Sequence, residues 1–418
     1  MSINEDNIKL IDGGICAVSG VETGGIKEGK YGVAIILSLD SNAQAVFTSN
    51  KVVAAPIIHT KKIIKDGKLS AIVANSGNAN CFTGEQGIKD CEYIVDHTSK
   101  LLNVPKDQIA SSSTGVIGRK MPMDIIEPLI DKVSEKLDHS AEASTDAASA
   151  IMTTDTHPKE CAVEITIDGK PVRIGGICKG SGMIAPNMGT MLAYITTDAI
   201  IDSKFIKIAL SNSVSKSFNM IVVDGDESTN DTALLMANGK SNVEVVDRDI
   251  INKDFQNALD YLCINLAKQM VRDGEGASKF LEVNIKGALS PSDAILASKS
   301  VASSMLFKSA IFGEDPNWGR IVSAVGYSGC EMNQDIISIS IGNESTFKNP
   351  LTDKSVYLVK DGEILAFEET ENLKVAEKFM ASNDIVVDID LNLSDGEATA
   401  WGCDLTYDYV KINGEYTT

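Results

Sequence analysis

Helix-type and strand-type hydrophobic periods alternate along the chain, and this alternation restricts it to a mixed α/β fold. Apolar residues recur at steps of three and four in three segments, 88–102, 126–137 and 255–270, which predicts three amphipathic helices. Apolar and polar residues alternate on both sides of Asp168–Gly169, which predicts a β-hairpin with a type I′ turn. Antiparallel hairpins together with long helices are typical of a layered α+β architecture.

The length of 418 residues predicts two or three domains, at roughly 150 residues per domain. A boundary is expected near residues 282–290, where a helix-and-turn region gives way to the strand-like run 281–285. We therefore predict a main domain over residues 1–282 and a smaller C-terminal α/β domain over residues 283–418.

Acidic residues outnumber basic residues by 58 to 38, which gives a formal net charge of −20. No cluster of Lys and Arg offsets this charge locally, so neither nucleic acid nor an anionic membrane is an expected partner. No run approaches 18 consecutive apolar residues, and the N-terminus carries charges where a signal peptide would be apolar. The eight cysteines stand singly, without a CxxC pair, which predicts reduced thiols and a cytoplasmic protein.

Neither a metal site nor a resident cofactor is expected. The four histidines have no zinc-ligand spacing and give little support to a Ser-His-Asp hydrolase. Residues 180–185 formally fit a GxGxxG/A dinucleotide fingerprint, but Pro186 would lie inside the helix that must follow. Residues 388–392 imitate the start of an EF-hand loop, but Leu393 stands where the loop needs Gly, and apolar alternation explains the run as a strand.

Three polar, glycine-rich segments, 75–80, 111–118 and 313–320, differ from ordinary core or surface sequence. In the second segment, three serines and a threonine precede Gly115, where backbone N–H groups can approach an anion closely. Each segment is also compatible with a plain turn or ordered loop, with Trp318 as a packing anchor in the third. The residues alone leave both interpretations open.

The most informative segment runs from Lys179 to Ala193, KGSGMIAPNMGTMLA. If the Thr190 hydroxyl attacked the Gly189 carbonyl, an N-to-O acyl shift and hydrolysis would leave Thr190 as a new N-terminus. Its α-amino group, with an ordinary pKa near 7.7 to 8.0, can then act as the base for its own hydroxyl. This chemistry needs no histidine. A Gly-Thr step that merely enters a buried strand is the competing interpretation.

Eight motifs give the chain a resemblance to one family over nearly its whole length. They are NSGNAN with CFTGEQG, SSSTGVIGRKMPMD, AIMTTDTHPKE, KGSGMIAPNMGTMLA, VDGDESTNDT, RDGEGASK, FGEDPNWGRI and NGEYTT. In this order they resemble the ArgJ family of ornithine acetyltransferases. The resemblance implies a self-cleaving enzyme of arginine biosynthesis with an N-terminal threonine nucleophile, a glutamate N-acetyltransferase that moves acetyl from N2-acetyl-L-ornithine to L-glutamate.

The resemblance also implies roles for individual residues. Thr190 is the nucleophile, cleavage lies between Gly189 and Thr190, and Thr114 with Gly115 stabilises the oxyanion. The family usually has Ala before the nucleophile, so Gly189 leaves the cleavage rate open. The implied substrate-contacting residues are Thr153, Lys179, Thr190, Glu275, Asn413 and Thr418.

The fold implied by the resemblance is a layered α/β/β/α sandwich, shared with self-processing aminopeptidases, with the C-terminal tail returning to the active site. Cleavage would give an alpha chain, residues 1–189, and a beta chain, residues 190–418. Family members resemble α2β2 heterotetramers in which the two chains stay associated.

Three alternatives remain open at this point. One is a bifunctional enzyme that also takes acetyl from acetyl-CoA as a co-substrate. Another is an aminopeptidase-like hydrolase that passes the acyl group to water. The third is a structural or binding protein that is only matured by cleavage.

Overall fold

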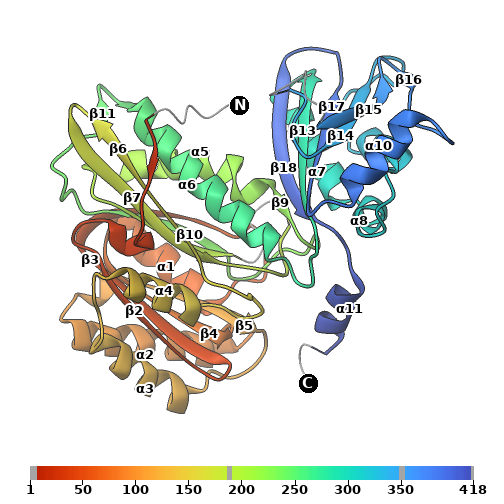
Figure 1. Ribbon diagram of the computed structural model, residues 1–418. Coiled ribbons are helices and arrows are strands. Elements are labelled where there is room, and N and C mark those ends of the chain that lie inside the picture. Colours follow the sequence, from red (N-terminus) through yellow and green to blue (C-terminus); the bar gives the residue numbers. More distant parts are fainter. Residues whose placement is uncertain (1–6, 186–190, 348–353, 416–418) are drawn as a thin grey trace. The chain divides into compact units, whose positions relative to one another are not determined.

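The computed structural model describes residues 7–185, 191–347 and 354–415 (Figure 1). The chain divides into two compact units. The N-terminal unit comprises Ser2–Asn219 and Asp226–Met270, and the C-terminal unit comprises Met220–Gly225 and Val271–Thr418.

This division differs from the predicted boundary between residues 282 and 283, which falls inside strand β13 (Phe280–Ala288). Strand β9 (Ile221–Val222) joins the C-terminal unit because it pairs with β18 (Gly396–Cys403). The partner of β9 therefore lies about 180 residues downstream in the sequence, at Trp401–Gly402. Such a long-range pairing leaves no local mark in the sequence.

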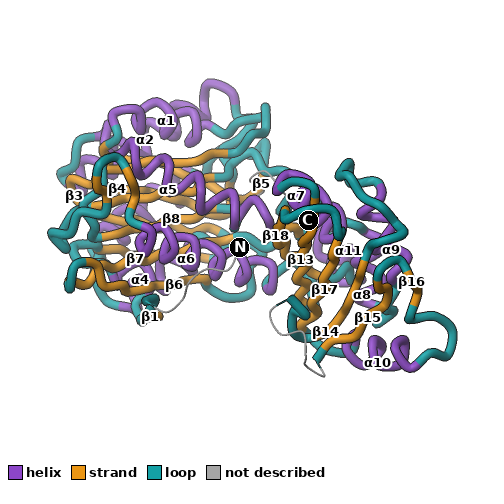
Figure 2. The backbone as a smooth tube through the Cα atoms, turned by 90° about the horizontal axis from the view of Figure 1, so that it is seen from above, coloured by secondary structure: helices purple, strands orange, loops and turns teal. Residues whose placement is uncertain are grey.

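A nine-stranded sheet forms the frame of the N-terminal unit, in the order β1-β6-β7-β8-β10-β3-β4-β5 with β2 paired to β3 (Figure 2). The strands are β1 (Lys9–Leu10), β2 (Glu22–Glu28), β3 (Tyr31–Phe47), β4 (Lys68–Asn78), β5 (Ile109–Val116), β6 (Lys159–Ile167), β7 (Lys170–Lys179), β8 (Leu192–Thr197) and β10 (Thr232–Ala237). Strands β8 and β10 are parallel, as are β4 and β5. The predicted hairpin is confirmed as β6–β7, because Asp168 and Gly169 both have positive φ, 50° and 76°, as a type I′ turn requires.

Strands β3 and β4 form one part of this sheet, strands β8 and β10 form another, and the two parts enclose one buried core. Ile36 of β3 and Ile72 of β4 belong to the same hydrophobic cluster as Leu192 of β8 and Leu234 of β10. Helix α4 (Ala141–Ala150) contributes its alanines to that cluster. Side chains alternate across a strand, so the opposite face of each part is left for other helices.

Helices cover those opposite faces. Val33 of β3 packs with helices α2 (Gly84–Leu102) and α3 (Met123–Ser134). A Cβ on Gly176 of β7 would lie near Leu262 and Leu266 of α6 (Lys253–Arg272). The order helix, strand, strand, helix confirms the predicted layered α/β class. The three predicted amphipathic helices correspond to α2, α3 and α6.

Further helices of this unit are α1 (Ala55–Ile63) and α5 (Ser203–Lys216), and a two-stranded sheet pairs β11 (Val246–Asp247) with β12 (Ile250–Ile251).

Among the described residues no single helix is long and apolar enough to cross a bilayer. By length and composition alone, the bent pair α7 (Pro291–Ser303) and α8 (Met305–Phe312) passes that test. The eight cysteines are free thiols.

The C-terminal unit contains a seven-stranded sheet in the order β16-β15-β14-β17-β13-β18-β9. Its strands not yet named are β14 (Ser338–Gly342), β15 (Ser355–Lys360), β16 (Glu363–Ile364) and β17 (Asp384–Asp390), and its further helices are α9 (Trp318–Gly326), α10 (Glu371–Met380) and α11 (Tyr407–Gly414). Asp388, in the EF-hand-like run, lies in β17 and accepts hydrogen bonds from Asn284, Ser345 and Thr346. The strand interpretation of that run is confirmed. Trp318 begins α9, and its Nε1 donates to the Ala366 carbonyl at 2.8 Å, which supports its role as a packing anchor.

Helix α4 lies so close to β2 that only glycine fits at one point of contact. A Cβ on Gly25 would stand 2.3 Å from the Asp146 carbonyl oxygen and 2.6 Å from the Ala147 Cα, both on the helix backbone. We expect Gly25→Ala to push α4 outward and to lower the free energy of unfolding by about 1–3 kcal/mol, the usual cost of overpacking. Denaturant unfolding measures this change.

The neighbouring Gly24→Ala provides the matched control. A Cβ there meets the Lys136 carbonyl oxygen at 3.4 Å, an ordinary contact, so a much smaller loss is expected. Equal losses for the two variants would contradict the proposed close approach.

Candidate active site

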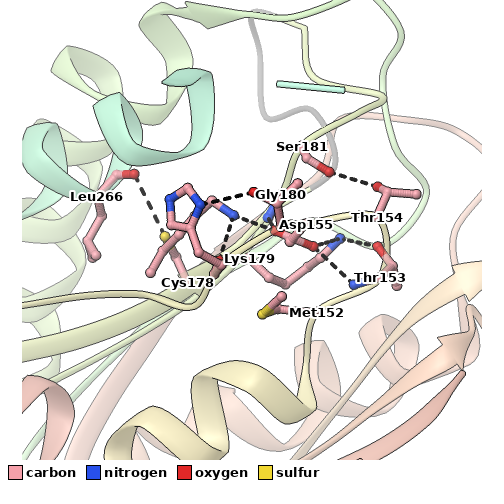
Figure 3. Close-up of polar contacts among 12 residues, drawn as sticks. Met152, Thr153, Thr154, Asp155, Cys178, Lys179, Gly180, Ser181 and Leu266 are labelled. Carbon is pink, nitrogen blue, oxygen red and sulfur yellow. Dashed lines mark hydrogen bonds and ion pairs between the residues drawn. The ribbon is translucent and has the colours of Figure 1, made fainter. Parts of the chain in front are cut away.

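Lys179 and Thr153, two residues that the sequence indicated as substrate contacts, meet in the N-terminal unit (Figure 3). Lys179 is the last residue of β7, and Thr153 follows the end of α4. The Lys179 Nζ donates a hydrogen bond of 2.9 Å to the Thr153 Oγ1. Lys27 of β2 donates to the carbonyl of Met152 at 2.7 Å and so fixes the residue before Thr153.

The Asp155 carboxylate connects these two residues. Its Oδ2 accepts from the Thr153 N–H at 3.0 Å and lies 3.6 Å from the Lys179 Nζ. Its Oδ1 accepts from the Lys159 Nζ and from the Gly180 N–H, both at 2.7 Å. Burial alone would raise the pKa of the Asp155 carboxyl, but the charges of Lys179 and Lys159 hold it below its ordinary value.

A second contact joins the segment after α4 to the segment after β7. The Thr154 Oγ1 and Ser181 Oγ share a hydrogen bond of 2.7 Å. Residues 180–185 form no helix, so the glycine run here lacks the context of a dinucleotide fingerprint. Instead, Gly180 and Ser181 begin the non-helical run 180–185.

Thr114 and Gly115 lie at the end of β5, beside the parallel strand β4. Gly115 has φ 131°, and a Cβ there would stand 2.4 Å from the backbone carbon of Gly77. Only glycine therefore permits the two backbones to approach so closely. The Ser113 Oγ donates to the Asn75 Oδ1 at 2.6 Å, so the polar segments 75–80 and 111–118 form one packed structure.

Asn230 and Asp231 link this strand end to the start of β8. The Asn230 Nδ2 donates to the carbonyls of Ser113 at 2.8 Å and Ala79 at 2.7 Å. The next side chain, Asp231, accepts from the Met191 N–H at 2.8 Å through Oδ1. Met191 directly follows Thr190 in the sequence.

Asp231 is fully buried, and among the described residues its Oδ2 has no hydrogen-bond partner. Burial raises the pKa of this carboxyl well above its ordinary value. Asp231 and Asp155 were not predictable as site residues, because an acidic residue outside a periodic segment resembles a surface residue until its burial is known.

Glu275 and Asn413, two of the substrate contacts that the resemblance implies, meet in the C-terminal unit. The Asn413 Nδ2 donates to the Glu275 Oε2 at 2.7 Å. A Cβ on Gly276 would stand 2.6 Å from the Tyr409 backbone nitrogen. The first turn of α11 therefore packs directly against the backbone next to Glu275. Gly189, Thr190 and Thr418 lie outside the described residues.

No group of three or more His, Cys, Asp or Glu side chains is arranged to hold a metal ion within the described ranges 7–185, 191–347 and 354–415. The side chains described above are hydroxyls, amides, carboxyls and ammonium groups. These groups can bind a carboxylate, hold an ammonium group and stabilise an oxyanion.

We expect Asp231→Asn to make the protein more stable at neutral pH. A carboxyl whose pKa is raised in the folded state binds its proton more tightly than in the unfolded chain. Its contribution to stability is therefore present at acidic pH and is lost as the pH rises above the unfolded pKa near 3.9. Asparagine keeps the bond to the Met191 N–H and has no proton to lose.

The free energy of unfolding of wild type and Asp231→Asn, measured between pH 4 and pH 8, tests this pH dependence. The two proteins should have similar stability near pH 4, and the advantage of the variant should grow with pH. A variant that is less stable by the same amount at every pH would show that the carboxyl is not held protonated.

Comparison with known proteins gives a consistent result. The model of the "ArgJ family" matches residues 18–418. A glutamate N-acetyltransferase from Methanothermobacter thermautotrophicus is 49% identical over 412 residues, which cover 98% of this chain and 99% of that protein. A glutamate N-acetyltransferase from Methanocaldococcus jannaschii is 50% identical over 415 residues, which cover 98% of this chain and all of that protein.

Among solved structures, the arginine biosynthesis bifunctional protein argJ from Bacillus halodurans is 40% identical with a TM-score of 0.48. The match covers 54% of this chain and 100% of the solved chain. Ornithine acetyltransferase from Mycobacterium tuberculosis, solved as a complex with ornithine, is 29% identical with a TM-score of 0.40. That match covers 44% of this chain and 99% of the solved chain.

Proposed function

The chain belongs to the ArgJ family of acetyltransferases in arginine biosynthesis, and we propose that it moves acetyl from N2-acetyl-L-ornithine to L-glutamate. The reaction proceeds in two steps through an acetyl ester on Thr190. The nucleophile is first released by cleavage of the chain between Gly189 and Thr190.

One observation carries this proposal. Two successive side chains, Asn230 and Asp231, link the end of the strand that holds Thr114 and Gly115 to Met191. An oxyanion pair must lie a short, fixed distance from its nucleophile. A rigid connection to the residue that follows Thr190 meets that requirement.

Cleavage needs only Thr190 and water. The Thr190 Oγ attacks the Gly189 carbonyl carbon, the hydroxyl proton passes to the Thr190 nitrogen as the peptide C–N bond breaks, and Gly189 is left as an ester on Oγ. Water then hydrolyses the ester, which restores the hydroxyl and leaves a free α-amino group on Thr190. The new amine has an ordinary pKa near 7.7 to 8.0, so it can accept a proton at neutral pH.

Acetyl transfer uses that amine as the base. It takes the proton from the Thr190 Oγ, which attacks the acetyl carbonyl of acetylornithine, and the Thr114 hydroxyl and Gly115 N–H stabilise the oxyanion. The proton then passes to the departing α-amine of ornithine. The amine of glutamate attacks the ester in the reverse sequence and releases N-acetylglutamate.

Lys179 and Thr153 hold the α-carboxylate that both substrates share, because a buried ammonium beside a hydroxyl offers charge-assisted hydrogen bonds. Glu275, oriented by Asn413, holds the side-chain ammonium of acetylornithine. Thr418 is a further substrate contact in this proposal. No metal or resident cofactor enters these steps, and acetyl-CoA is a candidate second donor.

Fragments 1–189 and 190–418 stay associated after cleavage in this proposal, as the chains of a cytoplasmic α2β2 heterotetramer. The sheet supports their association. Strand β7, before the cleavage site, pairs with β8, after it, from Lys179–Leu192 to Ile174–Thr197. The two fragments therefore contribute adjacent strands to one sheet.

Intact mass of the denatured, purified protein tests the cleavage step. Wild type should give two fragments, the second beginning at Thr190, because the hydroxyl and the scissile carbonyl belong to adjacent residues. Thr190→Ala should give one chain of 418 residues and no transfer activity. Cleavage in the alanine variant would exclude Thr190 as the nucleophile of maturation.

Transfer assays test the substrates and separate the alternatives. Acetylornithine with glutamate should yield N-acetylglutamate. A rate with acetyl-CoA as donor would establish a bifunctional enzyme, and acetate release without any need for glutamate would indicate a hydrolase.

Glu275→Gln should lower kcat/KM for acetylornithine about 10- to 100-fold, since a hydrogen bond to a charged group contributes about 1.5–3 kcal/mol. The Glu275→Gln protein should be cleaved between Gly189 and Thr190 to the same extent as wild type. Glu363→Gln, an exposed position on β16 of the same unit, serves as the matched control and should change neither. Equal loss of cleavage and transfer in Glu275→Gln would assign the residue to folding or maturation instead.

A further inference from the structure

Asp155, Lys159 and Lys179 form a buried charge cluster with one negative and two positive groups, which we call the Asp155 cluster. The side chains of Asp155 and Lys159 are 0% exposed and that of Lys179 is 2% exposed. Burial of an uncompensated charge is costly, so a buried cluster is stable only when its charges are balanced or when a ligand balances them. Within the cluster one positive charge is in excess. Two described groups also act on it: Lys27 adds a positive charge near Asp155, and burial raises the pKa of the Asp231 carboxyl near Lys179, which favours the neutral form of that carboxyl.

The two lysines do not share the carboxylate equally. The Lys159 Nζ lies 2.7 Å from the Asp155 Oδ1, within hydrogen-bond distance, whereas the Lys179 Nζ lies 3.6 Å from Oδ2. Lys159 is therefore the direct ion-pair partner of Asp155. Lys179 makes its hydrogen bond to a neutral hydroxyl, that of Thr153.

Asp155 also fixes the backbone around Lys179. It accepts from the N–H of Thr153 and from the N–H of Gly180, the residue directly after Lys179. The carboxylate thus holds both ends of the Lys179–Thr153 contact. Because these bonds join Asp155 to Thr153, Gly180 and Lys159 of the chain itself, we treat Asp155 and Lys159 as positioning residues.

We propose that Lys159 neutralises Asp155 so that Lys179 keeps an unbalanced positive charge, and that the α-carboxylate of the incoming amino acid supplies the missing negative charge. The proposal rests on the proposed function, because it deepens the role of Lys179 and Thr153 in that site. It assigns the affinity for the carboxylate to a residue, Lys159, that does not touch it.

A double-variant cycle tests the charge balance directly. Lys159→Gln leaves Lys179 as the ammonium group within ion-pair distance of Asp155 in the part of the chain that the structure describes. The KM for glutamate should therefore rise about tenfold or more while kcat changes little. Asp155→Asn combined with Lys159→Gln removes one charge of each sign and leaves Lys179 unbalanced again. The double variant should therefore have a KM several-fold below that of Lys159→Gln. Recovery stops short of wild type, because asparagine has one acceptor oxygen for the N–H groups of Thr153 and Gly180.

The pair of Lys216 and Asp260 provides the matched control. The Lys216 Nζ lies 2.6 Å from the Asp260 Oδ2 in the same unit, between α5 and α6. Lys216→Gln makes the same chemical change to an Asp–Lys pair away from the candidate site. It should leave KM unchanged, and thermal unfolding of all variants should show that each one is folded.

A double variant that binds glutamate no better than Lys159→Gln would overturn the proposal. If the Asp155–Lys159 pair had only a structural role, replacing Asp155 as well would not restore glutamate binding. Titration calorimetry with glutamate repeats the cycle without catalysis. If wild type transfers no acetyl but glutamate affinity follows the cycle, the proposed function fails and the charge balance holds. If glutamate binds with the same affinity to wild type and to Lys159→Gln, or does not bind to wild type, the charge balance is wrong.

Discussion

The Asp155 carboxylate is the interaction on which the candidate site depends. It lies between the end of α4 and the end of β7, and it binds the backbone of Thr153 and Gly180 and the side chain of Lys159. A buried carboxylate with this many donors remains ionised, and its removal would leave two buried ammonium groups without a counterion. The close contact of α4 with Gly25 fixes the helix whose end presents Thr153.

The pairing of strands in the N-terminal sheet would keep the two proposed fragments together. Strand β8 lies between β7 and β10, antiparallel to the first and parallel to the second. Because β7 precedes residue 190 and β8 and β10 follow it, backbone hydrogen bonds join the two sides of the proposed cleavage site. The same arrangement brings Asp231, just before β10, to Met191. In the proposed function, strand pairing therefore both stabilises the sheet and positions Met191, the residue after the proposed nucleophile.

Local features of the fold were predictable from the sequence, and long-range features were not. The β6–β7 hairpin follows from Asp168–Gly169 because a type I′ turn needs two residues that tolerate positive φ. The division between Met270 and Val271 was not predictable, because β13 belongs to the C-terminal unit through its pairing with β17 and β18, which come about 100 residues later in the sequence. Asp155 and Lys159 stand four residues apart outside any helix, and only the folded arrangement shows that both are buried. The candidate site residues came from family motifs, since spacing alone left Gly189–Thr190 open to an ordinary interpretation.

The central claim is that an acetyl ester on Thr190 links the two half-reactions. The most direct test is the intact mass of the protein after incubation with acetylornithine alone and rapid denaturation. The account predicts one acetyl group on the fragment that begins at Thr190, and its loss on addition of glutamate with formation of N-acetylglutamate. Transfer at full rate with no acetyl group ever found on that fragment would contradict the account.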